Sequence, residues 1–192
     1  MIITISGLPG AGKTTTARLL AERLGYRYYS MGDLRGKMAT ERGLTIDELN
    51  EKAKSDPTSH TAVDEYQKKL GETEVNFIID GWMSWRFIPD SFKVFMTIDP
   101  DEAALRIFEA KKKDPSRSDE PDYTSVEDAK ETITRRVEVT RKQFKDLYGV
   151  DFTDPANYDA VIDTTGQASA NETVEKILKA MKEQGLLTGL TV

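Results

Sequence analysis

The chain has 192 residues, a formal net charge of −6 at pH 7, no cysteine and one histidine. Its length fits one ordinary domain, and the absence of cysteine excludes disulfides, thiolate metal sites and cysteine nucleophiles. An acidic chain must gather its basic groups locally to bind an anion, which disfavours nucleic-acid binding along the whole sequence. No apolar run approaches the roughly 18 residues of a membrane helix. The N-terminus lacks the basic region and cleavage site of a secretory signal, so we expect a cytoplasmic protein.

Short β-rich runs alternate with helical patterns along the chain. We predict strands at residues 2–6, 26–30, 75–80, 92–99 and 158–163. Runs such as "FII" and "VFMTI" are nearly continuous, as in parallel strands that helices cover on both faces. The alternation therefore predicts a three-layer α/β fold. Gly25 is expected to end the first helix, and Ser169 with Glu172 has the spacing of a capping box that would begin the last.

The first predicted strand leads into "GLPGAGKTT", which matches the phosphate-loop pattern G-x-x-x-x-G-K-[ST] between a strand and a helix. Glycines allow the backbone N–H groups of such a loop to converge on phosphate oxygens. Lys13 is expected to neutralise the transferred phosphate, and Thr14 to offer its hydroxyl to Mg²⁺. Thr15 is either a second phosphate donor or an ordinary helix residue. We expect ATP to bind at Gly7, Gly10, Ala11, Gly12, Lys13, Thr14 and Thr15.

The segment after the second strand, "SMGDLRGKMA", offers a second phosphate site. Asp33 stands near the start of a predicted helix, where backbone N–H groups and Arg35 would bind an acceptor phosphate. The alternative is that Asp33 is an ordinary helix N-cap and the cations are solvated. A largely helical insert follows before the third strand, and in it Asp64 and Gln67 either recognise a base or ribose or are solvated positions.

The third strand ends in "FIIDGW", which separates the main classes of phosphate-loop protein. Asp80 is suited to orient a magnesium-bound water. Gly81 follows it, whereas many mechanical ATPases have a water-activating glutamate there. The GTPase-like "DTTG" at residues 163–166 comes after the last strand, so we interpret Asp163 as a strand end. These features favour phosphoryl transfer to a bound acceptor.

Residues 111–125 carry two prolines, many charges and no apolar periodicity, and are placed where a lid is expected. Arg117 lies near the centre of this segment, and Arg136 and Arg141 lie on the helix predicted after it. We expect Arg117 and Arg136 to contact the transferred phosphoryl group and Arg141 to bind substrate. The alternative for each arginine is a solvated surface charge.

Taken together, these residues resemble the short archaeal-type cytidylate kinases, within the nucleoside monophosphate kinases and the P-loop NTPase superfamily. The resemblance is carried by "ISGLPGAGKTT", "MGDLRGKMATERGLT", "SDPTSHTAVDEYQKKLGE", "FIIDGWMSWRFIP", "RSDEPDYTSVED" and "YGVDFTDPANYDAVIDTT". It implies conversion of CMP and dCMP to diphosphates with ATP and Mg²⁺, and a five-stranded parallel sheet. It also implies a nucleotide-binding insert and a short lid. We expect a single domain that is a monomer, with a core at 1–36 and 73–192, an acceptor-binding insert at 37–72 and a lid at 111–125. Gly81 joins the expected substrate contacts.

The chain also departs from the pattern of this family. Gly36, Trp82 and Gln143 stand where members commonly have arginine. Arg35 and Arg86 are candidates to compensate, and Trp82 either packs in the core, which we favour, or stacks on a base. Two alternatives therefore remain open: a kinase for another acceptor, and a nucleotide-binding regulator or slow ATPase.

Overall fold

The computed structural model describes residues 1–44, 58–114 and 121–187. The strands are β1 (Ile2–Gly7), β2 (Arg27–Ser30), β3 (Phe77–Asp80), β4 (Phe92–Thr97) and β5 (Ala160–Asp163). The helices are α1 (Lys13–Leu24), α2 (Met31–Glu41), α4 (Thr58–Thr73), α5 (Ser84–Phe87), α6 (Pro100–Lys113), α7 (Val126–Tyr148) and α8 (Ala170–Glu183), with a 3₁₀ turn at Pro155–Asn157.

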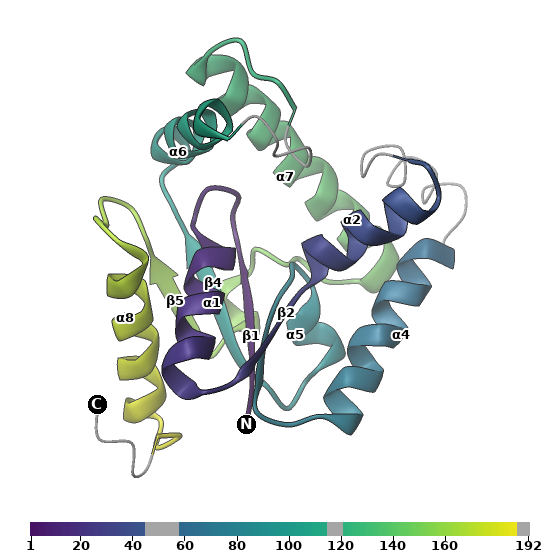
Figure 1. Cartoon of the computed structure of the whole chain (residues 1–192), viewed down its shortest axis with the longest axis vertical. Coiled ribbons are helices and arrows are strands. Elements are labelled where there is room, and N and C mark those ends of the chain that lie inside the picture. Colours follow the sequence, from purple (N-terminus) through teal and green to yellow (C-terminus); the bar gives the residue numbers. More distant parts are fainter. Residues whose placement is uncertain (45–57, 115–120, 188–192) are drawn as a thin grey trace.

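The five strands form one parallel sheet in the order β2-β3-β1-β4-β5. Strand β1 is central. In the sheet, β3 and then β2 lie on one side of it, and β4 and then β5 lie on the other. Ligands of open α/β sheets bind outside the carboxyl ends of the strands, at the point where the strand order changes direction. The loop after β1 lies there, below α6 and α7 in Figure 1.

Helices cover both faces of the sheet, as the sequence predicts. On one face, α1 and α8 pack over a core that includes Ile3, Ile5 and Val94. On the other face, α2 and α4 enclose Phe77 and Ile79, which are fully buried. Figure 1 shows α6 and α7 together at the edge of the molecule above the phosphate loop, where they share a small core of their own.

All five predicted strands are present, but four have shorter bounds than the β-rich runs. Asn76 adopts a left-handed conformation with φ of 56°, so β3 begins only at Phe77. At the end of β4, the Asp99 side chain accepts hydrogen bonds from the backbone N–H groups of Asp101 and Glu102. Asp99 therefore belongs to the cap of α6 and not to the strand.

The predicted helix ends are only partly confirmed. Gly25 ends α1 in a left-handed conformation with φ of 66°. Helix α8 begins at Ala170 and buries an apolar face that includes Val174, Ile177, Leu178 and Met181. The capping box is wrong, because the Ser169 side chain accepts no capping hydrogen bond. The burial of the apolar face fixes this helix without the cap.

Among the described residues, no helix combines the length and the apolar character needed to cross a bilayer.

Candidate active site

The phosphate loop is pressed closely against β4 and α6. Gly7 has φ of 150°, and a Cβ atom there would lie 2.4 Å from the carbonyl oxygen of Met96. Gly10 has φ of 80°, and its Cβ would lie 2.8 Å from the Cα of Ala103. Any side chain at either position would collide with backbone, so only glycine fits. The glycines therefore allow the tight turn of a loop that leads directly into the N-terminus of α1. Such a turn is the geometry of an anion-binding loop.

Lys13 lies over the loop that precedes it. Its Nζ donates a hydrogen bond to the carbonyl oxygen of Leu8 at 3.0 Å. Ala11 is buried and Thr15 is exposed, while Gly12 takes a left-handed conformation as the N-cap of α1. The Lys13 ammonium group and the N-terminus of α1 thus both lie beside the phosphate loop, where each favours the binding of a phosphate.

The two side chains expected at the magnesium ion, Thr14 and Asp80, contact each other directly. The Thr14 hydroxyl at the start of α1 donates to Oδ2 of Asp80 at 2.8 Å. The Tyr28 hydroxyl on β2 donates to the same oxygen at 3.1 Å. Asp80 is buried at 5 % exposure. Burial, followed by the charge of Asp80, raises the pKa of Tyr28 to about 12, so the phenol remains a proton donor at neutral pH.

This oxygen cluster fits Mg²⁺. Hydroxyl and carboxylate oxygens are the hard ligands that Mg²⁺ prefers, and it is usually bound by one or two protein groups together with substrate phosphates. Within the described residues, no group of three or more histidine, cysteine or acidic side chains forms a cage for a metal. Thr14 and Asp80 are thus suited to a metal that arrives with the nucleotide.

A second cluster joins three helices on the acceptor side. The Tyr148 hydroxyl on α7 donates to Oδ2 of Asp64 on α4 at 2.8 Å. Burial raises the pKa of Asp64 and lowers the pKa of Arg35 on α2, while the electrostatic attraction between these two side chains opposes both shifts. The fold therefore brings together Arg35 and Asp64, two of the candidate acceptor residues.

Asp33 is not the N-cap of α2. It is the third residue of the helix, and its backbone N–H donates to the Ser30 hydroxyl at 3.2 Å, so Ser30 takes the capping position. The Asp33 carboxylate lies 3.6 Å from the guanidinium of Arg18, and both side chains are exposed.

Gly81 and Gln67 are both closely packed against Ser84. The backbone N–H of Gly81 donates to the carbonyl of Ile5 at 3.1 Å. A Cβ at Gly81 would lie 2.4 Å from the Ser84 hydroxyl oxygen. Gln67 is neither solvated nor exposed for base recognition, because it is 3 % exposed and accepts a hydrogen bond from that hydroxyl at 2.7 Å.

The candidate arginines have different surroundings. The guanidinium of Arg136 lies over the Trp82 ring, 5.9 Å from its centroid. Nε of Arg141 donates to Oδ2 of Asp151 at 2.6 Å, and this hydrogen bond is the main cause that lowers the pKa of Asp151 to about 2. Arg117 lies outside the described residues.

Trp82 packs in an aromatic cluster, which confirms the packing interpretation. Its ring stacks on Phe152 with centroids 5.0 Å apart and meets Phe144 edge-on at 6.3 Å. Phe144 comes from α7 and Phe152 from the segment that follows it. The cluster therefore docks the carboxyl-terminal half of α7 beside β3.

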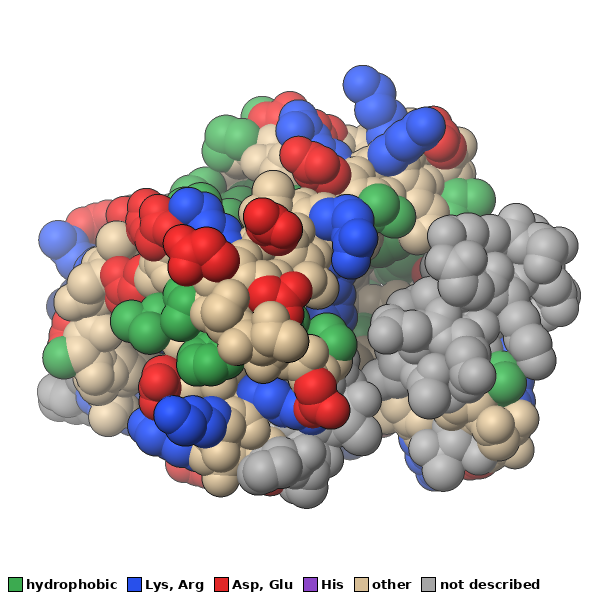
Figure 2. Space-filling model, turned by 90° about the horizontal axis from the view of Figure 1, so that it is seen from above, with side chains coloured by type: hydrophobic (Ala, Val, Ile, Leu, Met, Phe, Trp, Pro, Cys, Tyr) green, Lys and Arg blue, Asp and Glu red, His purple; other side chains and the backbone are tan. Residues whose placement is uncertain are grey.

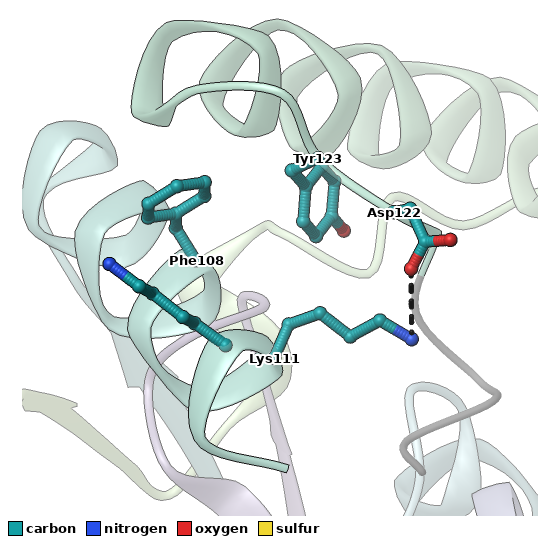
Figure 3. A pocket seen from close by; sticks show the side chains of 5 residues that line it. Phe108, Lys111, Asp122 and Tyr123 are labelled. Carbon is teal, nitrogen blue, oxygen red and sulfur yellow. Dashed lines mark ion pairs between the residues drawn. The ribbon is translucent and has the colours of Figure 1, made fainter. Parts of the chain in front are cut away.

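A pocket of about 360 Å³ lies between α6 and the segment before α7 (Figure 3). It is lined by Phe108, Lys111, Lys112, Asp122 and Tyr123. The Lys111 ammonium lies 3.5 Å from the Asp122 carboxylate and so joins the two described flanks of the expected lid. None of the lining residues belongs to the phosphate loop or the Asp80 cluster, so this pocket is separate from the candidate phosphate and metal site.

Reasoning from the sequence missed Tyr28, Tyr148 and Asp151. Each is joined by its side chain to a candidate residue on another element. The tyrosine-rich run "YRYY" was the only signal for Tyr28, and it indicates a strand without indicating a partner.

Comparison with known proteins gives the family. The model of the cytidylate kinase-like family matches residues 2–166. A cytidylate kinase of Archaeoglobus fulgidus is 32 % identical and covers 95 % of both chains. One of Methanocella arvoryzae is 35 % identical over 86 % of this chain and 88 % of its own.

Two further similarities are more limited. A nucleotide dehydratase of Lacinutrix mariniflava that depends on S-adenosylmethionine is 35 % identical over 92 % of this chain, but the chain spans only 35 % of that protein. The solved shikimate kinase of Acinetobacter baumannii shares the fold, with a TM-score of 0.64 and 18 % identity over 97 % of this chain and 95 % of its own. With its match to the family model and to full-length relatives, the chain belongs to the cytidylate kinase-like family.

Proposed function

We propose that the protein transfers the γ-phosphoryl group of ATP to CMP or dCMP, forming ADP and CDP or dCDP. The observation that carries this proposal is the Thr14–Asp80 contact of 2.8 Å beside the phosphate loop and Lys13. Thr14 and Asp80 supply oxygen ligands and Lys13 supplies a cation, at the place where the charge of the transferred phosphoryl group must be stabilised. The full-length relatives named cytidylate kinase support the choice of acceptor.

On the donor side, Lys13 and the N–H groups of the loop would bind the phosphates of ATP. Thr14 and Asp80 would hold Mg²⁺, whose positive charge would stabilise the negative charge of the phosphates during transfer. Lys13, which donates to the Leu8 carbonyl, would direct its ammonium group to the phosphates.

On the acceptor side, Asp33, Arg35, Asp64 and Gly81 would line the site for the nucleoside monophosphate. Arg136 and Arg141 on α7 would bind phosphate, with Arg141 exchanging Asp151 for the substrate. Arg117 would join them from the lid at residues 111–125. We also propose that residues 37–72 form the acceptor-binding insert of a single kinase domain.

A different acceptor is the second candidate, and the aromatic environment of Trp82 favours it. Members of the family commonly have arginine at this position, whereas here an indole is stacked on Phe152. A charge-assisted phosphate contact contributes about 1.5–3 kcal/mol, so its loss would weaken ordinary CMP binding. The dehydratase reaction is not proposed, because this chain matches only a third of that relative.

An acceptor panel tests the proposal. ADP formation from Mg·ATP is measured with no acceptor and with CMP, dCMP, UMP, AMP, GMP or shikimate. We expect CMP and dCMP to give the fastest turnover. Preference for another acceptor would support the second candidate, and equal rates with and without every acceptor would indicate an ATPase.

The partners of this proposed enzyme are its nucleotide substrates. Figure 2 shows acidic and basic side chains interspersed over the viewed face, an arrangement that does not suit a polyanion. From the net charge of −6 and the membership of a nucleotide kinase family, we propose a monomer that acts on free nucleotides in the cytoplasm and binds neither nucleic acid nor membranes.

A further inference from the structure

We propose that Tyr28 is a positioning residue whose hydroxyl holds the Asp80 carboxylate for the metal that accompanies ATP. This inference rests on the proposed kinase function. Oδ2 of Asp80 accepts two hydrogen bonds, from Thr14 at 2.8 Å and from Tyr28 at 3.1 Å. The two donors come from different elements, α1 and β2, so they fix the carboxylate from two sides.

The sheet register explains how Tyr28 reaches Asp80. Tyr28 is paired with Ile78 on β3, and Asp80 lies two residues farther along that strand. Residues two apart in a strand share a face, so the Tyr28 side chain and Asp80 lie on the same side of the sheet. Tyr28 and Ile78 both pack in the core beneath α1, and Thr14 is in the first turn of that helix.

The Tyr28 ring is itself held in place. The guanidinium of Arg18, one helical turn beyond Thr14, lies over the ring at 5.4 Å from its centroid. Arg18 is also 3.6 Å from Asp33. The tyrosine therefore lies between the sheet and α1, with its hydroxyl directed to the Asp80 carboxylate.

The two hydroxyls have separate tasks once a nucleotide binds. Thr14 belongs to the phosphate loop, and its oxygen becomes a metal ligand in the proposed complex. Tyr28 is outside the loop, so its hydrogen bond to Asp80 persists when Thr14 turns to the metal. Groups that orient a metal-binding carboxylate in this way typically affect metal affinity by about 10- to 100-fold.

Tyr29 provides a matched control. Its hydroxyl also donates to a carboxylate, that of Glu74, at 2.7 Å. However, it is the next residue on the same strand and packs on the opposite face of the sheet, with Phe77 and Ile79. Tyr28→Phe and Tyr29→Phe therefore delete the same type of hydrogen bond, one beside the metal cluster and one away from it.

Metal binding without turnover tests the inference. Mn²⁺ replaces Mg²⁺, with an ATP analogue that has an NH group between the β and γ phosphorus atoms, and free Mn²⁺ is measured by electron paramagnetic resonance. We expect Tyr28→Phe to weaken Mn²⁺ binding in this complex about tenfold, and Tyr29→Phe to leave it within about twofold. Equal Mn²⁺ affinities in the wild type and both variants would overturn the positioning role of Tyr28 and leave the proposed function standing. Mn²⁺ binding with the wild type that is no tighter than with the analogue alone would overturn the proposed function as well.

A second comparison separates positioning from packing. Tyr28→Phe is added to Asp80→Asn, which removes the charge that Tyr28 is proposed to hold. We expect the double variant to bind Mn²⁺ as weakly as Asp80→Asn. A further tenfold loss would show that Tyr28 acts through packing and would overturn the inference.

Discussion

The indole of Trp82 stacks on the ring of Phe152, with centroids 5.0 Å apart and the planes inclined by 23°. The resemblance to the cytidylate kinases led us to expect an arginine at this position, and the contact explains how the chain accommodates an indole there instead. The space around residue 82 is filled by aromatic rings from α7 and the segment after it. Restoring an arginine would therefore have structural consequences as well as chemical ones.

Trp82→Arg is predicted to destabilise the fold. The substitution removes a stacked, half-buried ring and brings a second cation toward Arg136, whose guanidinium now lies over the indole. Loss of an aromatic side chain from a packed site costs about 3 kcal/mol or more. Urea denaturation should show this loss, whereas Trp82→Phe, which keeps a ring, should lose less than half as much. An arginine variant as stable as the wild type would contradict the packing role.

Lys13→Ala is predicted to abolish most phosphoryl transfer and to leave the fold intact. The ammonium group donates to the carbonyl oxygen of Leu8 at 3.0 Å, and the side chain contributes charge rather than core packing. Removal of a group that stabilises transition-state charge lowers kcat by about 10²–10³-fold. Steady-state kinetics and thermal denaturation should be compared with Lys179→Ala on α8, an exposed position. Normal turnover in Lys13→Ala would remove Lys13 from the site.

Tyr148→Phe is predicted to weaken acceptor binding more than it slows chemistry. The variant deletes the hydrogen bond that holds Asp64 beside Arg35. A loss of roughly 1 kcal/mol corresponds to about a fivefold rise in KM for CMP, with kcat nearly unchanged. Tyr66→Phe serves as the control, because Tyr66 lies on the same helix as Asp64 and is exposed. If both variants keep the wild-type KM, the cluster of three helices is structural only.

The Arg141–Asp151 ion pair predicts a pH dependence of stability. The pKa of Asp151 is lowered to about 2 in the folded chain, whereas the ordinary value is about 3.9. The carboxylate therefore stabilises the fold above about pH 4, and this contribution is lost as the pH falls toward 2. The difference in Tm between the wild type and Asp151→Asn should be largest near neutral pH and shrink in acid. A difference that stays constant with pH would argue against the ion pair.

The sequence predicted what depends on local pattern. The phosphate loop, Asp80 at the end of β3 and the apolar face of α8 follow from spacing along one segment. The contacts of Tyr28 with Asp80, Tyr148 with Asp64 and Arg141 with Asp151 depend on strand register and on how α7 docks. Spacing within a segment contains no such information. The Ser169 cap failed for a related reason, because burial of the helix overrides a weak local preference.

The fate of the γ-phosphoryl group tests the central claim most directly. ATP labelled in its γ-phosphate is mixed with Mg²⁺, CMP and excess enzyme, and the products are separated after a single turnover. The account predicts that the label appears in CDP and that Lys13→Ala leaves it in ATP. Label released as inorganic phosphate at a rate independent of CMP would contradict the kinase assignment.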